Sequence, residues 1–168
     1  MKKTLYLIGG TMGVGKTTTC RQLQQKLPAC VFLDGDWCWD MHPFIVNDET
    51  KEMVTQNIAF LLNQFLHCSA YENVVFCWVM HQQSIWDDIL SRLDTAGAEV
   101  RCISLICNEE ALTARLQKDV ESGLRQPDVI ARSVERLPLY NDLSTEKLDV
   151  SGLSPEEAAA VIAGGRAL

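Results

Sequence analysis

Residues 5–17 read LYLIGGTMGVGKT, an apolar stretch of strand length that runs directly into the pattern G-x-x-x-x-G-K-T. The glycines of this pattern can take backbone conformations closed to other residues, so successive N–H groups can turn toward an anion. Lys16 can reach the β- and γ-phosphates of a nucleotide, and Thr17 can offer its hydroxyl to Mg²⁺ at the start of a helix. The predicted nucleotide contacts of this loop are Gly10, Thr11, Met12, Gly13, Val14, Gly15, Lys16, Thr17 and Thr18.

Length and composition describe an ordinary globular chain. The 168 residues are enough for one domain with a sizeable core, which we expect to span residues 1–168. A net charge of −7 argues against a large nucleic-acid surface, and no apolar run approaches the roughly 20 residues of a membrane helix. A cleavable signal would remove the loop strand, so we expect a cytoplasmic protein without nucleic-acid or membrane partners. A monomer and a homodimer both remain open.

The seven cysteines form no C-x-x-C pair, and their number is odd. In a cytoplasmic chain this pattern is typical of reduced, mostly buried thiols. A metal site from Cys38, His42 and His81, with Asp36 nearby in sequence, is the alternative. No second pair at metal-ligand spacing supports that alternative.

Strand-length apolar runs alternate with helical patterns along the whole chain, which is typical of βαβ units around a parallel sheet. The two longest runs are apolar at nearly every position, as expected for strands covered on both faces. The chain is therefore predicted to be an α/β protein. Its strands are predicted at residues 4–8, 30–33, 73–80, 99–107 and 147–150.

Helix starts are marked by capping residues. The first helix is expected at residues 17–27, and the second opens near Asn47 or Asp48. Residues 84–87 have the spacing of a capping box for the third, which Gly97 is expected to close. Asn108 begins the next helix, and residues 154–157, reading SPEE, begin the last.

Two acids follow the second predicted strand, in the sequence Leu33-Asp34-Gly35-Asp36. The carboxyl ends of parallel strands share one sheet edge, so these acids should lie beside the phosphate loop. Phosphoryl transfer to a hydroxyl needs one group for the hydroxyl proton and one to help hold Mg²⁺. Because the third strand carries no acid, we assign Asp34 to Mg²⁺ and Asp36 to the acceptor. The reverse assignment, and a turn in which an Asp only bonds backbone N–H groups, remain alternatives.

Aromatic residues crowd the segment after the acidic pair, and two more potential contacts follow the third strand. Trp37 and His81 are predicted to contact an acceptor, which aromatic walls would suit if it were planar or amphipathic. Core filling is an equal alternative for Trp37 and the preferred one for Trp78.

With this loop, the acidic pair and an arginine-bearing polar insertion before the fifth strand, the chain resembles the small P-loop kinases of the nucleoside-monophosphate-kinase class, including gluconate, adenylylsulfate and shikimate kinases. The resemblance implies a three-layer fold with strand order 2-3-1-4-5, bound ATP and Mg²⁺, and a mobile lid, here residues 118–138. It also implies that Arg115 packs on adenine, that the loop at Ser151 closes the other side of the base, and that Arg125 and Arg132 close from the lid. Surface ion pairs with neighbouring acids are the alternative for the lid arginines.

The chain departs from this class after the third strand, where residues 78–83 read WVMHQQ in place of the frequent Asp-Gly and substrate arginine. This weakens the case for a phosphorylated acceptor. No N-K-x-D segment follows the fourth strand, which disfavours a signalling GTPase. We therefore expect an ATP- and Mg²⁺-dependent kinase acting on a small-molecule hydroxyl, with a nucleoside monophosphate kinase and a non-catalytic ATP-binding adaptor as alternatives.

Overall fold

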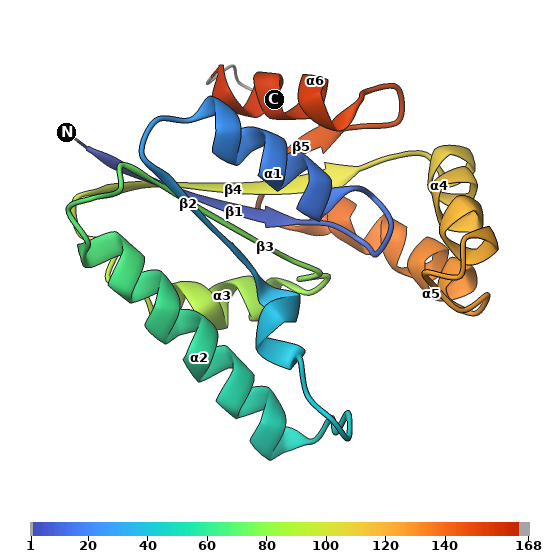
Figure 1. The fold of residues 1–168 in the computed structure, drawn as a ribbon, viewed down its shortest axis with the longest axis horizontal. Helices are drawn as coiled ribbons and strands as arrows, with labels where there is room; N and C mark the ends of the chain where they lie inside the picture. The colour runs from blue at the N-terminus through green and yellow to red at the C-terminus, as the bar shows by residue number, and fades with distance from the viewer. Residues whose placement is uncertain (1, 165–168) are drawn as a thin grey trace.

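A five-stranded parallel sheet in the order β2-β3-β1-β4-β5 forms the centre of the molecule (Figure 1). The computed structural model describes residues 2–164. This architecture confirms the predicted fold class and strand order. The strands are β1 (Lys3–Gly9), β2 (Cys30–Asp34), β3 (Asn73–Trp78), β4 (Ala98–Ile106) and β5 (Glu146–Asp149).

Helices cover both faces of the sheet and make the outer two layers. Helices α1 and α6 lie on one face and α2 and α3 on the other, while α4 and α5 lie beyond the ends of the strands (Figure 1). The α-helices are α1 (Lys16–Lys26), α2 (Asp48–His67), α3 (Gln83–Ser91), α4 (Glu109–Glu121), α5 (Val129–Arg136) and α6 (Pro155–Ala163). Two 3₁₀ helices, η1 (Gly35–Trp39) and η2 (Leu137–Asp142), complete the fold.

The core has two parts, one on each face of the sheet. Because side chains alternate along a strand, Tyr6 and Ile8 of β1 pack with residues of α1 and α6, whereas Leu5 and Leu7 pack with residues of α2 and α3. All four are buried, which explains the unbroken apolar sequence of β1.

Most of the predicted helix starts are confirmed. Asn47 and Ser154 each form a capping box, and the Asn108 side chain accepts a hydrogen bond from the backbone of Ala111. The box predicted at Ser84 is wrong, because α3 begins two residues earlier than such a box requires and Gln82 is its N-cap. The Asp87 side chain, which was expected to accept from the backbone of Ser84, accepts instead from the side-chain amide of Gln83 at 2.9 Å. Gly97 lies after the helix, which already ends at Ser91.

Strand β3 ends at Trp78, two residues before the predicted end, since Met80 has a left-handed backbone (φ 41°) that leaves the strand conformation. The remaining boundary differences are one or two residues. Within residues 2–164 no helix is long and apolar enough to cross a bilayer. All seven cysteines are free thiols, of which Cys20, Cys77 and Cys107 are buried and the other four are partly exposed.

The predicted lid is the end of α4, a turn and α5. It packs more closely against the rest of the molecule than its polar sequence suggests, because Val129 and Ser133 are buried. The Thr11 hydroxyl of the phosphate loop donates to the Ser133 carbonyl at 2.9 Å. Helix α5 is therefore attached to the loop, and the turn between α4 and α5 is the more exposed part of the lid.

Candidate functional site

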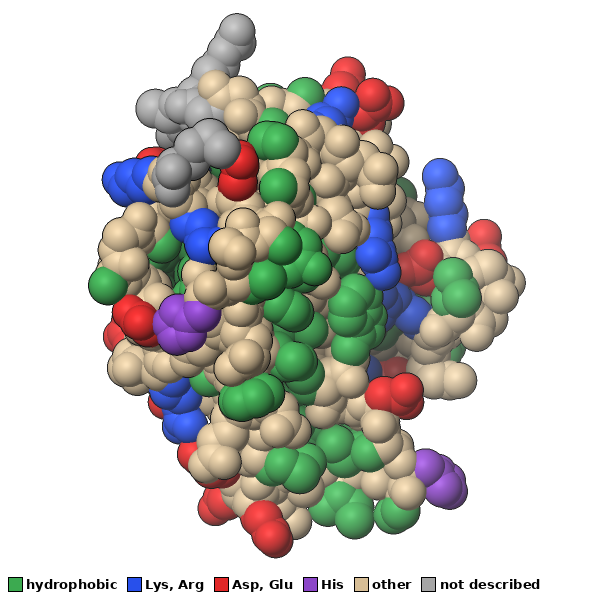
Figure 2. All heavy atoms as spheres, turned by 60° about the vertical axis from the view of Figure 1, so that its left-hand side comes forward, with side chains coloured by type: hydrophobic (Ala, Val, Ile, Leu, Met, Phe, Trp, Pro, Cys, Tyr) green, Lys and Arg blue, Asp and Glu red, His purple; other side chains and the backbone are tan. Residues whose placement is uncertain are grey.

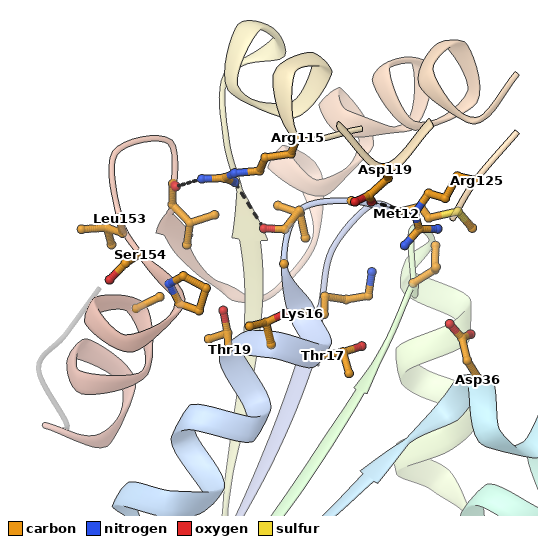
Figure 3. A pocket seen from close by; sticks show the side chains of 18 residues that line it. Met12, Lys16, Thr17, Thr19, Asp36, Arg115, Asp119, Arg125, Leu153 and Ser154 are labelled. Atoms are coloured by element: carbon orange, nitrogen blue, oxygen red, sulfur yellow. Dashed lines mark hydrogen bonds and ion pairs between the residues drawn. The ribbon is translucent and has the colours of Figure 1, made fainter. Parts of the chain in front are cut away.

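A cavity of about 360 Å³ lies where the phosphate loop meets the carboxyl ends of β2 and β3 (Figure 3). The loop contributes most of its floor, α4 and the following turn one wall, and the segment before α6 another. From residues 10–18, the cavity is lined by Met12, Gly13, Val14, Gly15, Lys16, Thr17 and Thr18. Gly10 and Thr11 lie behind it. A Cβ on residue 10 would lie 2.7 Å from Val14 Cγ1, so close packing explains why this residue is glycine.

Lys16 opens α1 directly after Gly15, whose φ of 103° is a conformation suited to glycine. The Lys16 ammonium donates to the Thr11 carbonyl at 3.1 Å, which folds the side chain back over the loop. Burial lowers the pKa of Lys16, although the nearby carboxylates of Asp36 and Asp34 act to raise it. A cation held in a partly dry loop is well placed to bind phosphate.

Thr17 and Asp34 are directly linked. The Thr17 hydroxyl donates to Asp34 Oδ2 at 2.6 Å, and the other carboxylate oxygen accepts from the Asp36 backbone N–H at 3.0 Å. Asp34 is 5% exposed. The turn in which an Asp bonds a backbone N–H, left open by the sequence, is thus present at Asp34, and the same carboxylate also contacts Thr17 of the phosphate loop.

Asp36 lines the same cavity as Lys16. Its side chain reaches the cavity from η1, on the side opposite the α6 end (Figure 3). Burial, and then the negative charge of Asp34, raise the pKa of Asp36 above its ordinary value. The intervening Gly35 is required by packing, because a Cβ there would be 2.7 Å from Trp78 Cγ.

Two arginines close the cavity from the other side. Arg115 on α4 donates to the backbone carbonyls of Val14 at 3.3 Å and Val150 at 2.6 Å, and so joins the phosphate loop to the segment after β5 (Figure 3). Arg125, in the turn after α4, pairs with Asp119 at 3.0 Å, and both line the cavity. This ion pair is the arrangement that the sequence left as the alternative for the lid arginines, although Asp119 itself was not expected to line the cavity.

Two predicted residues, Arg132 and Ser151, have other contacts and do not line this cavity. Arg132 is exposed on α5 and pairs with Asp128 at 3.1 Å. Ser151 donates to the Asp149 carboxylate at 2.6 Å and accepts from the Asn108 backbone, so its hydroxyl organises the turn after β5. The wall of the cavity next to α6 is formed by Val150, Leu153, Ser154 and Pro155.

The remaining predicted residues line two adjoining cavities. His81 lines one of about 510 Å³ between α2, α3 and α5, which shares Val79 with the phosphate-loop cavity. Trp37 lines the other, of about 670 Å³, together with Asp36. Trp37 is 46% exposed and packs edge-on against Phe32, with ring centroids 5.3 Å apart.

Trp39 and Trp78 line both of these cavities and form the wall between them. Trp78, which the sequence analysis assigned to the core, thus also borders open space. Among residues 2–164, no cluster of three or more His, Cys, Asp or Glu is arranged to hold a metal ion. Arg136, one of the arginines of the predicted lid, faces the His81 cavity from the end of α5, a position that the sequence did not predict.

A family model described as "AAA domain" matches residues 7–136. No curated protein matches the sequence. Solved structures match over nearly the whole chain: a tunicamycin resistance protein from Deinococcus radiodurans has a TM-score of 0.69 at 20% identity, covering 96% of this chain and 94% of its own. A gluconokinase from Sinorhizobium meliloti 1021 has a TM-score of 0.66 at 17% identity, covering 97% and 94%.

A shikimate kinase from Bacteroides thetaiotaomicron has a TM-score of 0.64 at 16% identity, covering 95% of each chain. At such identities these similarities show a common fold and nothing finer. That fold is the one shared by P-loop kinases, in which a nucleotide-binding loop lies between the first strand and the first helix.

Proposed function

The chain belongs to the AAA domain family, and on that premise we propose that it is an ATP- and Mg²⁺-dependent kinase that transfers a phosphoryl group to a hydroxyl of a small molecule. One observation carries the proposal: a single cavity is bordered by the Lys16 ammonium, the Thr17 hydroxyl that is bonded to Asp34, and the free carboxylate of Asp36. Phosphate binding, metal holding and proton transfer therefore have separate groups in one place.

The residues present fit Mg²⁺, which prefers oxygen ligands. The Thr17 hydroxyl spends its proton on Asp34, so that its lone pairs are available to a cation. Thr17 would hold the ion directly and Asp34 through water, and the bound ion would supply charge that neutralises the nucleotide phosphates. Asp34 also fixes the rotamer of Thr17, since both of its carboxylate oxygens are engaged.

Asp36 is proposed to accept the proton of the acceptor hydroxyl. The hydroxyl oxygen forms a bond to the γ-phosphorus as the bond from that phosphorus to the β,γ-bridging oxygen breaks, and ADP leaves with the electron pair. The raised pKa of Asp36 brings it closer to the working pH, which favours proton transfer by a carboxylate. Lys16 stabilises the charge on the transferring group.

Arg125 is proposed to act from the lid, by leaving Asp119 and binding phosphate oxygens when the nucleotide is present. Asp119 lines the cavity too, so the exchange needs only a local movement of the turn. A lid role for Arg132 stays a prediction.

The deciding experiment is an ADP-release screen with sugars, sugar acids, nucleosides, nucleoside monophosphates, and aminoglycoside- and phenol-type antibiotics as acceptors. The names of the similar structures, a gluconokinase and a shikimate kinase among them, support hydroxyl compounds as the first set. We expect acceptor-dependent ADP release that disappears in Asp36→Asn. A non-catalytic adaptor would bind ATP and release no ADP with any acceptor, and a nucleoside monophosphate kinase would respond to monophosphates alone.

A further inference from the structure

The backbone of Val79 and Met80, which precedes His81 and lines its cavity, is held by two buried aromatic side chains. The Trp86 indole donates to the Met80 carbonyl at 2.8 Å, and the Tyr140 hydroxyl donates to the Val79 carbonyl. Both aromatic side chains are buried, and Met80 between them has a φ of 41°. A left-handed non-glycine residue persists only where its surroundings hold it, and such residues cluster at functional sites. The direction in which His81 leaves β3 is therefore fixed.

Charge on the cavity wall is unbalanced. Arg136 is half-buried there and has no ion-pair partner within the part of the chain that the structure describes. Of the other charged lining residues, Asp88 accepts from Arg92 at 2.9 Å, and Lys51 has a side chain that is 60% exposed to water and lies 4.0 Å from Asp48. One positive charge thus faces a mainly aromatic and aliphatic cavity without a partner. Leaving a partly buried charge unpaired is costly, so its presence indicates a ligand that supplies the opposite charge.

His81 adds a directional donor. Its Nδ1 atom is buried and has no hydrogen-bond partner. A buried Nδ1 with an unpaired lone pair costs less free energy than a buried Nδ1–H without an acceptor. We therefore place the proton of the neutral ring on Nε2. Burial, and then the charge of Arg136, lower the pKa of His81, so that the neutral ring persists. A ring with its proton on Nε2 can donate a hydrogen bond to an acceptor oxygen but cannot take a proton there.

We propose that Arg136 and His81 form a recognition site for a carboxylate, so that the phosphoryl acceptor is an amphipathic hydroxy acid. The inference rests on the proposed kinase function and names the class of its acceptor. The acid lies against the wall of Trp39 and Trp78 with its carboxylate at Arg136, and its hydroxyl reaches Asp36 past Val79, which the His81 cavity shares with the phosphate-loop cavity.

A single unmatched positive charge selects a monoanion. Arginine binds carboxylates through two parallel hydrogen bonds, and His81 supplies one more neutral donor. A phosphate dianion would retain an uncompensated negative charge in a cavity that also contains Asp88. The aromatic wall covers the carbon skeleton, which favours acids with a ring or an aliphatic body over small, fully polar ones.

The test measures binding by calorimetry in the presence of Mg²⁺ and a non-hydrolysable ATP analogue, so it does not depend on turnover. The probes are 4-(hydroxymethyl)benzoate, shikimate and gluconate, each beside its methyl ester, with glucose 6-phosphate, which carries a phosphate and no carboxylate, as the phosphate arm. We expect at least one acid to bind tenfold or more tightly than its ester. Arg136→Gln should remove that preference and Arg136→Lys should keep part of it. Lys26→Gln, which removes a charge at the far end of α1, should leave it unchanged.

A second pair of variants tests His81 separately. The side-chain amide of His81→Gln reaches the place of Nε2, whereas the amide of His81→Asn reaches only the place of Nδ1. The Gln variant should therefore keep acid affinity within about threefold, and the Asn variant should lose about tenfold. Equal affinity for acids and esters, tighter binding of the phosphate compound, no effect of Arg136→Gln, or no binding of any acid would each overturn the proposal.

The two proposals fail differently. Acid binding that depends on Arg136 without any ADP release would leave the carboxylate site standing and remove the kinase. ADP release with neutral acceptors, at a rate that Arg136→Gln leaves unchanged, would keep the kinase and remove the carboxylate site.

Discussion

The nucleotide half of the site and the acceptor half are built in different ways. The phosphate-binding floor of the nucleotide half comes from consecutive residues, 10–18, held between one strand and one helix. The acceptor half is assembled from η1, α2, the end of β3, and α5, which are separated by up to about 100 residues in the chain. A local sequence pattern can therefore specify the first half, whereas only the fold brings the second half together.

The surfaces of the two halves differ as well. The phosphate loop presents backbone N–H groups and one cation, while the acceptor half presents indole rings and exposed apolar side chains. Phe44, Ile45 and Val46 are all more than 40% exposed in the segment between η1 and α2. Figure 2 shows hydrophobic side chains gathered over one face of the molecule. Binding at the acceptor half should depend on several weak contacts, and at the nucleotide half on a few strong ones.

Lys16→Ala should have the largest effect, because no other cation in the loop can replace the ammonium that folds over Thr11. We expect kcat/KM to fall by about 10³-fold, the upper range for one preorganised electrostatic contact. Steady-state kinetics measures the loss, and circular dichroism checks that the fold is retained. Activity close to that of the unmodified protein would show that the loop does not hold the reacting phosphate.

Asp36→Asn should separate the two halves. Turnover should fall roughly 10²–10³-fold, the range for a lost general base, while MgATP affinity measured by calorimetry stays near normal. Because turnover needs the carboxylate and its pKa is raised, kcat/KM should fall with decreasing pH at a pH above the ordinary range of an Asp. The variant should lose that acid limb. A large loss of nucleotide affinity would move Asp36 to the metal and Asp34 to the acceptor.

Sequence reasoning succeeded where one short segment determines the outcome. The strand order followed from the resemblance, while the capping box at Ser154 and the start of α2 near Asn47 followed from local patterns. The position of Asp34 beside the phosphate loop followed from the edge that parallel strands share. It failed at Ser84, where the hydrogen bond from the Trp86 indole to the Met80 carbonyl holds the segment that leads into α3. Competing contacts of this kind decide which residue caps a helix.

The acceptor half was only partly predictable for the same reason. Trp37 and His81 drew attention as unusual residues at strand ends, but nothing in the sequence placed Arg136 beside His81. The two are 55 positions apart, and α5 reaches the cavity because its buried Ser133 is bonded to Thr11. The unpaired Nδ1 of His81 likewise exists only in the folded chain.

Gly35→Ala should damage the acceptor half more than the nucleotide half. The new Cβ would lie 2.7 Å from Trp78 Cγ and 2.8 Å from Cδ1, so the indole must shift. Overpacking of this kind costs about 1–3 kcal/mol of stability. Thermal unfolding measures the loss, with Gly152→Ala as the matched control, since a Cβ there meets no atom within 4 Å. Equal melting temperatures for the two variants would show that Trp78 adapts freely.

Asp119→Asn should have the smallest effect and the opposite sign. The ion pair from Asp119 to Arg125 joins two partly exposed side chains, which limits its contribution to about 1 kcal/mol. If Arg125 must leave Asp119 to bind phosphate, removing the carboxylate charge should increase MgATP affinity by up to about fivefold, whereas Arg125→Ala should decrease it. Hydrogen exchange across residues 119–128 should slow on binding of the ATP analogue and an acceptor. A decrease in affinity in both variants, with unchanged exchange, would mean that the pair holds the turn in place and that Arg125 does not bind phosphate.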